Sequence, residues 1–564
     1  MSEFDENLLN SLKTGFVNDS HISKVEYQPK LIVNNSFGNL LSEINNSLEN
    51  CDSFIFFTTF LTKSGIASIK NSLKNAEERN IKGKILVSQY LNFTQPQALT
   101  ELLRFENIES RIVTDRDFHS KGYLFKTGNS YKIIIGSSNL TGPALSSNNE
   151  LNITLSSSGQ SKILKSFLEN FNTEFGNSTI ISKEYIQKYK EIYNESKIIE
   201  DKKEEKLNSI SEYEPNKMQK KALSNLDNQR INDIRKSLIV SATATGKTFL
   251  SAFDVLNFNA SRILFVVHRL NIAKKAKETF SYVFKDKRTL GLYSGLVKEV
   301  NKDFIFSTVQ TISREDHMKR FSPDHFDYII IDETHRAGAE SYQKIIDYFE
   351  PKFLMGMTAT PERTDGYDIF KLFDHNIGYE IRLHEAMEQK MLCEFHYFGI
   401  TDITVDGNIL DENTKFNLLI AEERVDRIIE KINFYGCDND AVRGLIFCSR
   451  VDECKELSNA FNRKGFKTVS LTGENSEDER EEAINRLESE DADFKLDYIF
   501  TVDVFNEGVD IPKINQIVML RPTQSSIIFI QQLGRGLRKQ QNKDFLTIID
   551  FIGNYQNNYL IPIA

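Results

Sequence analysis

Short apolar runs alternate with amphipathic stretches along most of the chain. In the first third, the runs SFIFFTTFL (53–61) and GKILVSQYL (83–91) are typical of buried strands. Between them, the segment SGIASIKNSLKNAEERN (64–80) has the apolar spacing of an amphipathic helix. Strands that alternate with helices in this way predict an α/β domain.

A charged stretch, SKEYIQKYKEIYNESKIIEDKKEEKLNSISE (182–212), interrupts this alternation and contains neither Gly nor Pro, which favours an exposed helix or a mobile tether. After it, strands and helices alternate again in two successive blocks, each long enough for a doubly wound parallel sheet. A chain of 564 residues also exceeds what one hydrophobic core usually holds. We therefore predict an α/β multidomain protein with a first domain at 1–178, a charged helical linker at 179–212, and two lobes at 213–388 and 389–564.

Composition narrows the function only a little. The formal net charge is −10, so any nucleic-acid binding must come from local basic patches and not from the chain as a whole. The five cysteines form no C-x-x-C pair, which argues against a zinc site or a disulfide framework and favours reduced, buried thiols. The amino terminus is polar, and no run of eighteen apolar residues occurs. We expect a cytoplasmic protein without membrane contact.

The segment DFHSKGYLF (117–125) places an imidazole and an ammonium two residues apart. If it is extended, His119 and Lys121 lie side by side on one face. A histidine beside a lysine on a half-exposed strand is more often a solvated surface than a site. The residues that follow favour chemistry, because an apolar strand (131–135) leads to the turn GSSNLT with Asn139, and Glu150 comes soon after.

These four side chains suit phosphoryl chemistry that needs no metal. A neutral imidazole at His119 can attack phosphorus, and Lys121 with Asn139 can hold the equatorial oxygens. Glu150 can orient and polarise the imidazole.

A phosphate-binding loop is predicted in the second domain, where SLIVSATATGKTFLSAF (237–253) reads as a strand, a small-residue loop and a helix start. Backbone N–H groups at a helix N-terminus bind phosphate oxygens, Lys247 would reach the terminal phosphates, and the Thr248 hydroxyl would bind Mg²⁺. Two positions depart from the strict pattern, because Ser241 replaces the first glycine and Ala244 stands where glycine is frequent.

An acidic pair follows another apolar strand in FDYIIIDETHRAG (326–338). Asp332 and Glu333 can hold Mg²⁺ and position an attacking water. Two phosphate-chemistry motifs in one domain make coincidence a poor explanation of either.

Eight short motifs follow one another in an order that resembles the motif series of superfamily 2 helicases and translocases: ATATGKT, VVHRLNIAKKA, STVQT, DETH, TATPER, LIFCSR, FNEGVDIP and QQLGRGLR. The resemblance covers roughly residues 213–560. It implies two RecA-like lobes, ATP with Mg²⁺ as cofactor, and Thr358, Ala359 and Thr360 as the link between ATP state and the nucleic-acid path.

The resemblance also implies residue roles. Glu333 would be the general base, and Arg535 and Arg538 would act as arginine fingers from the second lobe. Thr248 and Asp332 would be the metal ligands. The residues expected to bind the nucleotide are Gln219, Thr245, Gly246, Lys247, Thr248, Phe249, Asp332, Gly508 and Asp510.

The first domain resembles the phospholipase D superfamily through His119, Lys121, Asn139 and Glu150, and within it the metal-independent nuclease branch. The commonest family pattern has an aspartate five residues after the lysine, where this chain has Lys126. Members use two histidines, one as nucleophile and one as general acid, and the first domain of this chain has a single H-x-K. The resemblance therefore implies a homodimer joined through this domain, with a composite site and no cofactor.

A nuclease of this kind joined to a superfamily 2 motor resembles the modification-dependent (type IV) restriction enzymes, SauUSI-like proteins, which act on double-stranded, methylated DNA. In those proteins a further carboxy-terminal region reads modified cytosine. This chain ends at TIIDFIGNYQNNYLIPIA (547–564), just after the second lobe, so we expect that region to be absent here. The implied function is an ATP-dependent DNA endonuclease of a restriction or defence system.

Three alternatives stay open on the sequence. The first domain of a repair or defence helicase could merely dimerise or dock DNA. A lipid or small-molecule phosphodiesterase would fit the first domain but would leave the motor unexplained. The motor motifs also do not distinguish DNA from RNA.

Overall fold

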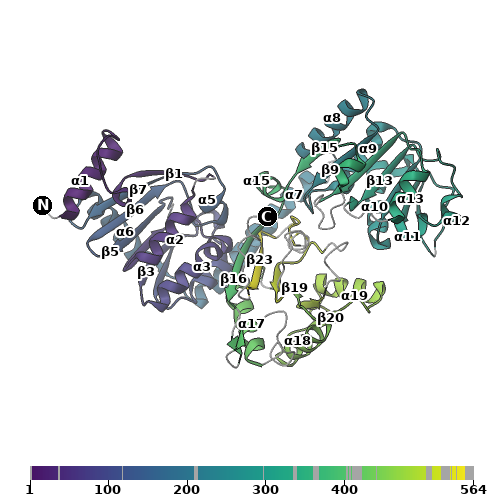
Figure 1. The fold of residues 1–564 in the computed structure, drawn as a ribbon. Coiled ribbons are helices and arrows are strands. Elements are labelled where there is room, and N and C mark those ends of the chain that lie inside the picture. Colours follow the sequence, from purple (N-terminus) through teal and green to yellow (C-terminus); the bar gives the residue numbers. More distant parts are fainter. Residues whose placement is uncertain are drawn as a thin grey trace. The chain divides into compact units, whose positions relative to one another are not determined.

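The computed structural model describes residues 3–35, 38–116, 118–208, 214–295, 297–334, 340–359, 368–401, 404–405, 408–409, 422–439, 441–502, 511–521, 534, 536–540 and 543–552. The chain divides into two compact units, Met1–Ile210 and Ser211–Ala564 (Figure 1). Each unit is described by itself.

A mixed eight-stranded sheet forms the centre of the first unit, in the order β1-β7-β6-β5-β2-β3-β4-β8. Strands β2, β3 and β4 run parallel, whereas β5, β6, β7 and β1 pair antiparallel in succession. The strands are β1 Lys30–Val33, β2 Ser53–Phe57, β3 Lys82–Ser88, β4 Ile108–Val113, β5 Gly122–Thr127, β6 Ser130–Gly136, β7 Leu151–Ser158 and β8 Thr179–Ile180.

Helices cover both faces of this sheet because its strands alternate their apolar side chains. Phe54 and Phe56 on β2 pack into one core, and Phe57 packs into the other, where it meets Phe167 and Phe171 of α6. The helices of this unit are α1 Glu3–Phe16, η1 Val25–Tyr27, α2 Leu40–Asn50, α3 Lys63–Glu78, η2 Tyr90–Asn92, α4 Pro96–Leu102, α5 Gly142–Ser146, α6 Lys162–Gly176 and α7 Lys183–Asn208.

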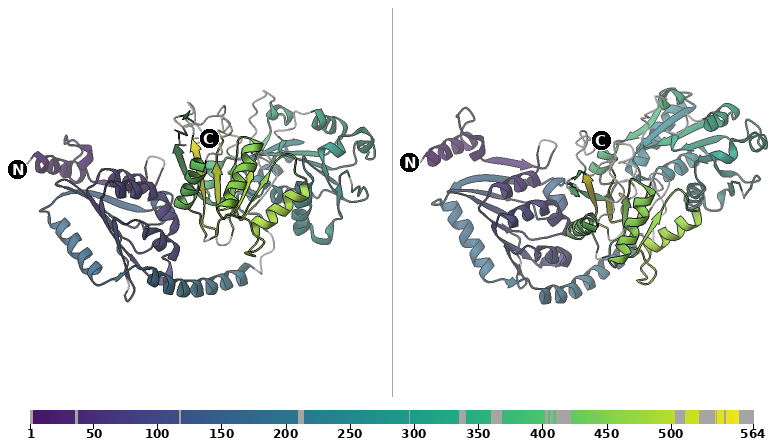
Figure 2. Two further views of the ribbon diagram at one scale, coloured as in Figure 1. Left: turned by 90° about the horizontal axis from the view of Figure 1, so that it is seen from below. Right: turned by 60° about the horizontal axis from the view of Figure 1, so that its bottom comes forward.

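The charged stretch expected as an exposed linker is one long helix, α7 (Figure 2). The expectation of full exposure is wrong for its first turns. Ile186 and Tyr189 are buried in the core that contains α3 and α4, with Tyr185 packed against the same core. An apolar residue every three or four positions is enough to bury one face of a helix that is otherwise charged.

The second unit begins with a seven-stranded parallel sheet in the order β11-β12-β10-β13-β14-β9-β15. Its strands are β9 Lys236–Ser241, β10 Ile263–Val267, β11 Leu290–Tyr293, β12 Phe304–Thr308, β13 Tyr328–Asp332, β14 Phe353–Thr358 and β15 Ile377–Ile381. The central strands are buried throughout, as expected for a parallel sheet covered by helices on both faces. The helices are α8 Lys217–Ile231, α9 Lys247–Phe258, α10 Leu270–Phe284, η3 Lys285–Lys287, α11 Val309–Ile312, α12 Glu315–Met318, α13 Glu340–Tyr348, α14 Ile369–Leu372 and α15 Leu383–Glu388.

A second parallel sheet follows, in the order β16-β23-β22-β19-β21-β20. Its strands are β16 Glu394–Thr401, β19 Gly444–Phe447, β20 Thr468–Leu471, β21 Tyr498–Thr501, β22 Gln516–Met519 and β23 Phe545–Ile552, with helices α17 Glu422–Tyr435, α18 Val451–Arg463 and α19 Glu477–Glu488. A small hairpin, β17 Thr404–Val405 and β18 Asn408–Ile409, lies between β16 and α17 in sequence.

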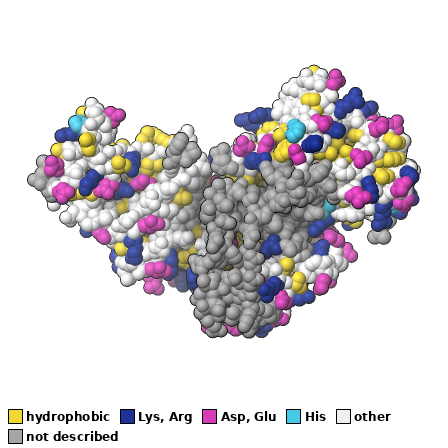
Figure 3. All heavy atoms as spheres, viewed as in Figure 1, with side chains coloured by type: hydrophobic (Ala, Val, Ile, Leu, Met, Phe, Trp, Pro, Cys, Tyr) yellow, Lys and Arg dark blue, Asp and Glu magenta, His cyan; other side chains and the backbone are white. Residues whose placement is uncertain are grey.

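All five cysteines are free and buried, as the sequence predicts. Basic and acidic side chains are interspersed over the described surface in the view of Figure 3. Among the helices of the described ranges, none is long and apolar enough to cross a lipid bilayer.

Candidate functional site

One edge of the first sheet collects the four side chains predicted from the sequence. His119 and Lys121 come just before β5, and Asn139 comes just after β6. Glu150 comes just before β7. Because β5, β6 and β7 pair antiparallel, the start of β5, the end of β6 and the start of β7 meet at the same edge.

The H-x-K motif lies in the approach to β5 and not within a strand, which begins at Gly122. His119 is exposed, and Lys121 is half-buried. Lys121 Nζ donates to Thr59 Oγ1 at 3.1 Å and to the backbone oxygen of His119 at 2.8 Å. The ammonium of Lys121 is therefore held at the base of the loop that presents the imidazole.

Asn139 is fixed by the loop that follows β2. Its Oδ1 accepts from the backbone N–H of Phe60 at 3.1 Å and from Thr58 Oγ1 at 3.2 Å. The Thr58 hydroxyl in turn accepts from the N–H of Leu140 at 3.0 Å. Because its oxygen is engaged in this way, the Asn139 amide can offer its N–H donors to a ligand, which suits an anion.

Glu150 accepts a short hydrogen bond from Ser137 Oγ, and that hydroxyl also accepts from the N–H of Leu151 at 3.1 Å. Partial burial lowers the pKa of Lys121, and the negative charge of Glu150 acts in the opposite direction. Glu150 is therefore close enough to interact electrostatically with the ammonium at this edge.

Three residues at this edge were not singled out from the sequence. Thr58 and Thr59 follow β2, and Tyr90 follows β3, which runs parallel to β2. The rings of Tyr90 and His119 lie with their centroids 4.3 Å apart at an interplanar angle of 70°. A polar residue directly after a buried strand is the only sequence signal that could have pointed to them.

Lys126 lies near the far end of β5, opposite Ser53 of β2. It is five residues from Lys121, about 17 Å along an extended strand. The position where the commonest related pattern has an aspartate is therefore remote from the edge that carries His119.

The second candidate site begins where β9 ends. The loop after β9 leads into α9, and Gly246 caps this helix with φ of +86°. Lys247 Nζ donates to the backbone oxygen of Ser241 at 2.9 Å, and Thr245 Oγ1 donates to the backbone oxygen of Ala242 at 2.7 Å. This curled loop at a helix N-terminus fits a phosphate group.

The glycine-like position in this loop is held by alanine. Ala244 has φ of +66°, in the left-handed region that favours glycine. The departure noted in the sequence therefore leaves the loop geometry in place but adds backbone strain.

Thr248 and Phe249 occupy the first turn of α9. Both are half-buried, and the Phe249 ring packs against an apolar core of the second unit. The backbone N–H of Phe249 belongs to the first turn of α9, where N–H groups can bind a phosphate.

Gln219 lies against this loop. It is buried, its Nε2 donates to the backbone oxygen of Gly246 at 3.2 Å, and its Oε1 accepts from the N–H of Asn216 at 2.9 Å. The glutamine expected to bind the nucleotide is thus also part of the capping box of α8, whose N-cap is Asn216, so it ties that helix to the phosphate-binding loop.

The acidic pair lies at the end of β13, at the same edge as the loop after β9 because both strands are parallel to β14 between them. Two strand spacings, about 10 Å, separate β9 from β13. Asp332 is nearly buried, and its Oδ1 accepts from the N–H of Glu333 at 3.0 Å. Glu333 has φ of +53°, so its carboxylate is presented from a strained backbone position.

Thr358 ends β14 between these two motifs and is buried together with Ala359. Arg538 is exposed. The predicted residues Thr360, Gly508, Asp510 and Arg535 lie outside the described residues.

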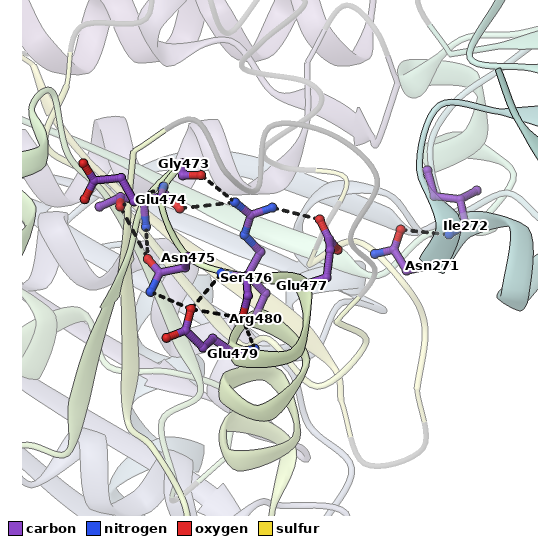
Figure 4. Close-up of polar contacts among 10 residues, drawn as sticks. Asn271, Ile272, Gly473, Glu474, Asn475, Ser476, Glu477, Glu479 and Arg480 are labelled. Atoms are coloured by element: carbon purple, nitrogen blue, oxygen red, sulfur yellow. Dashed lines mark hydrogen bonds and ion pairs between the residues drawn. The ribbon is translucent and has the colours of Figure 1, made fainter. Parts of the chain in front are cut away.

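Two further loop regions carry ordered polar contacts, drawn in Figure 4. At the start of α10, within VVHRLNIAKKA, Asn271 Oδ1 accepts from the N–H of Ile272 at 2.8 Å. In the other lobe, Arg480 of α19 donates to the backbone oxygens of Thr472 and Gly473 at 3.3 and 3.2 Å and bonds Glu477 at 2.9 Å. The Arg480 contacts shape the loop between β20 and α19, which no motif in the sequence indicates.

Comparison with protein families assigns each part of the chain separately. The family described as "Cardiolipin synthase, PLD-like domain" matches residues 40–175, which contain His119 to Glu150. "Type III restriction enzyme, res subunit" matches 212–363, and "Helicase conserved C-terminal domain" matches 423–540. The predicted fold class is confirmed: a phospholipase D-like domain precedes the two RecA-like lobes of superfamily 2.

Curated relatives match a little more than half of the chain. The "Putative ATP-dependent helicase IRC3" of Saccharomyces cerevisiae is 29% identical over 354 residues, which cover 57% of this chain and 50% of that protein. The type I restriction enzyme EcoAI endonuclease subunit of Escherichia coli is 25% identical over 366 residues, covering 57% of this chain and 44% of that subunit. The chain thus spans about half the length of these relatives.

Among solved structures, "The fragment structure of a putative HsdR subunit of a type I restriction enzyme from Vibrio vulnificus YJ016" is similar with a TM-score of 0.49 and 25% identity. The similarity covers 62% of this chain and 67% of that one.

Proposed function

We propose that this protein is an ATP-dependent DNA endonuclease of a restriction or defence system, in which a superfamily 2 translocase serves a metal-independent nuclease. The single observation that carries the proposal is the edge where His119, Lys121, Asn139 and Glu150 meet, in a chain that also has a phosphate-binding loop. This combination supports a phosphodiester-cleaving site and an ATP-binding site in one polypeptide.

In the nuclease, an imidazole nitrogen of His119 attacks the phosphorus of the scissile bond, and Lys121 with the Asn139 amide stabilises the charge on the non-bridging oxygens. A P–N bond forms and the P–O bond to the leaving oxygen breaks. The leaving oxygen takes a proton from a second histidine, and water then hydrolyses the phosphohistidine. Glu150, near Lys121, helps to keep the local charge balanced and the ring oriented.

The second histidine is supplied by another copy of the chain in this proposal. The described edge holds one H-x-K motif, so one copy provides half of a two-histidine site. The neighbouring loop exposes two large apolar side chains, Leu91 at 64% and Phe93 at 49%. Exposed apolar residues around a functional edge are typical of an interface, which favours a homodimer through this domain.

In the motor, bound ATP with Mg²⁺ supplies the energy of phosphoryl transfer to water. Lys247 and the N–H groups at the start of α9 bind the phosphates, and Thr248 with Asp332 would hold the metal ion. Glu333 accepts a proton from the attacking water, while Arg538 and Arg535 contribute positive charge from the second lobe. Closure of the lobes then moves double-stranded DNA past the nuclease.

The target is proposed to be modified DNA, with methylcytosine as the modified base. Cleavage and ATPase rates of this chain on methylated and unmethylated duplexes test this. Higher rates on the methylated duplex are the expected result. Equal rates on both duplexes contradict it.

Cleavage by His119→Ala tests the nuclease. We expect loss of cleavage with ATPase near the starting rate, and undiminished cleavage would rule out the nuclease assignment.

Chelation provides a second test, because EDTA should stop ATP hydrolysis while ATP-independent nicking continues. The mass in light scattering tests the dimer, and a monomer under active conditions would contradict it.

A second candidate function rests on the fact that the first domain has a single H-x-K motif. The protein would be a DNA repair or defence helicase whose first domain only dimerises or docks DNA. DNA-stimulated ATPase with no cleavage by either the starting chain or His119→Ala would favour it.

A further inference from the structure

The loop between β3 and α4, residues 89–95, reaches the same edge as His119. Tyr90 in this loop is half-buried and lies edge-on to the His119 ring, with centroids 4.3 Å apart and an interplanar angle of 70°. Since His119 is exposed, this ring contact restricts an imidazole that would otherwise rotate freely about its side-chain bonds. The orientation of the nucleophile thus depends on where Tyr90 is placed.

The backbone that places Tyr90 is strained. The next two residues, Leu91 and Asn92, have φ of +53° and +55°. Each left-handed non-glycine residue costs about 1 kcal/mol or more, so the loop needs contacts elsewhere to keep this shape. Two come from the loop itself: the N–H of Tyr90 donates to Ser88 Oγ at 3.0 Å, and Thr94 Oγ1 donates to the backbone oxygen of Ser88 at 2.6 Å.

Three further contacts come from α7. Tyr185 OH donates to Gln89 Oε1 at 2.8 Å, and Tyr189 OH donates to the backbone oxygen of Thr94 at 2.7 Å. The Asn92 amide donates to Ser196 Oγ at 2.9 Å. Positions 185, 189 and 196 lie on one stripe of a helix, so a single face of α7 holds the loop at its start, middle and end.

Helix α7 is also the last element of the first unit, and the chain passes from it into the second unit. The helix that holds the Tyr90 loop is therefore the covalent route from nuclease to motor. A shift of α7 along its axis would change the same three hydrogen bonds.

We propose that Tyr90 is a positioning residue for His119, and that α7 sets its position through Tyr185, Tyr189 and Ser196. The proposal rests on the proposed nuclease function and deepens it, because it identifies what orients the nucleophile and which element can alter that orientation. Tyr90 acts through the imidazole and needs no contact with the DNA.

The first test is Tyr90→Leu in the full chain, with Tyr90→Phe as the matched variant that keeps the ring. Misplacement of a reacting group costs on the order of 100-fold in rate, so Tyr90→Leu should lower kcat of cleavage by about 10- to 100-fold with KM for DNA changed less than threefold. Tyr90→Phe should restore kcat to within about twofold. Equal rates for both variants and the starting protein would overturn the proposal.

The second test addresses α7. The double variant Tyr185→Phe with Tyr189→Phe removes two hydroxyls and keeps both rings, and it should lower kcat of cleavage about 5- to 10-fold, since each lost hydrogen bond loosens the loop. Tyr131→Phe is the control, because Tyr131 packs in the core on the opposite face of the sheet. A double variant as active as Tyr131→Phe would overturn the role of α7.

ATPase rate and the melting temperature of each variant separate this proposal from simple unfolding. Both should stay near the starting values for Tyr90→Leu. His119→Ala distinguishes the two levels of inference: if it is inactive while Tyr90→Leu is fully active, the nuclease stands and the positioning role fails. If His119→Ala still cleaves, the nuclease assignment fails and the positioning role fails with it.

Discussion

The two candidate sites of this chain are built in different ways. At the edge that carries His119, the proposed nuclease edge, side chains are proposed to carry the chemistry. Neighbouring side chains hold them: Thr59 binds Lys121, and Thr58 binds Asn139. At the edge that carries the loop after β9, the proposed ATP edge, backbone is proposed to carry much of the binding, and left-handed residues shape it, with φ of +66° at Ala244 and +53° at Glu333. A side-chain site is sensitive to residue identity, whereas a backbone cradle is also sensitive to conformation.

The strand directions explain the difference. Antiparallel pairing brings both the starts and the ends of neighbouring strands to one edge, so polar residues before β5 and β7 join those after β6. In the parallel sheet only strand ends meet at that edge, and each is followed by a helix start or a tight turn. The first arrangement favours convergent side chains, and the second favours phosphate-binding N–H groups.

The largest effects should come from removing one group from each site in turn and measuring both activities of each variant. We expect His119→Ala to lower cleavage by more than about 10³-fold and Lys247→Ala to do the same to ATP hydrolysis, because each removes a group in direct contact with the reacting phosphate. The other activity of each variant, with ATP-independent nicking measured for Lys247→Ala, should stay within about twofold. Loss of both activities in either variant would mean that the two sites are not independently built.

Asn139 offers a sharper test of the side-chain site. Asn139→Asp keeps an oxygen for the Phe60 N–H and Thr58 hydroxyl but removes the N–H donors and adds a negative charge next to the phosphate. Cleavage should fall about 100-fold while the melting temperature stays near its starting value.

Asn139→Ala is the comparison variant because, unlike Asn139→Asp, it removes the oxygen that accepts from the Phe60 N–H. It should cost about 1–3 kcal/mol of stability in addition to the loss of cleavage. Equal melting temperatures for the two variants would show that Asn139 does not hold the loop.

Much of this organisation could be predicted from the sequence, and the reason differs by region. His119 and Lys121 directly precede an apolar strand, and the Gly246 to Thr248 loop joins a strand to a helix, so the topology brings both motifs to sheet edges. Thr58, Thr59 and Ser137 could not be predicted as supports of the site, since threonine and serine after a strand are common. Only the three-dimensional pairing of the strands, β2 with β5 and β6 with β5 and β7, gives them partners. The packing of α7 was missed for a similar reason, because charged residues outnumber the few tyrosines and isoleucines that bury its face.

A pH test extends the comparison to the second lobe. Burial of His396 on β16 lowers its pKa from 6.5 to about 4. A depressed folded-state pKa contributes stability that is present above pH 6.5 and is lost as pH falls towards 4, because the unfolded chain binds the proton first. At pH 4.5 the loss amounts to about 2.5 kcal/mol. Between neutral pH and pH 4.5, the melting temperature of the starting protein should therefore fall further than that of His396→Gln.

Asp550 on β23 gives the control of opposite sign. Burial raises its pKa to about 6, and Tyr397 donates to its Oδ2 at 2.7 Å. A raised folded-state pKa contributes stability at low pH that is lost as pH rises through 6. Asp550→Asn should therefore gain stability relative to the starting protein between pH 5 and 7, and the same pH response in both variants would contradict burial as the cause.

The smallest expected effect tests the backbone site directly. Ala244 has φ of +66°, so glycine at this position removes the clash of its β-carbon with the backbone, a relief of about 1 kcal/mol. Part of that gain is offset because glycine also makes the unfolded chain more flexible, by roughly 0.5–1 kcal/mol. We expect Ala244→Gly to leave the melting temperature equal or slightly higher and the ATPase rate unchanged.

Ala242→Gly is the control, because Ala242 is a buried loop residue without a left-handed φ. This substitution should lower the melting temperature through the entropic cost of glycine and the loss of a methyl contact. If both substitutions destabilise the protein equally, conformation at residue 244 is not what distinguishes the ATP edge from the nuclease edge.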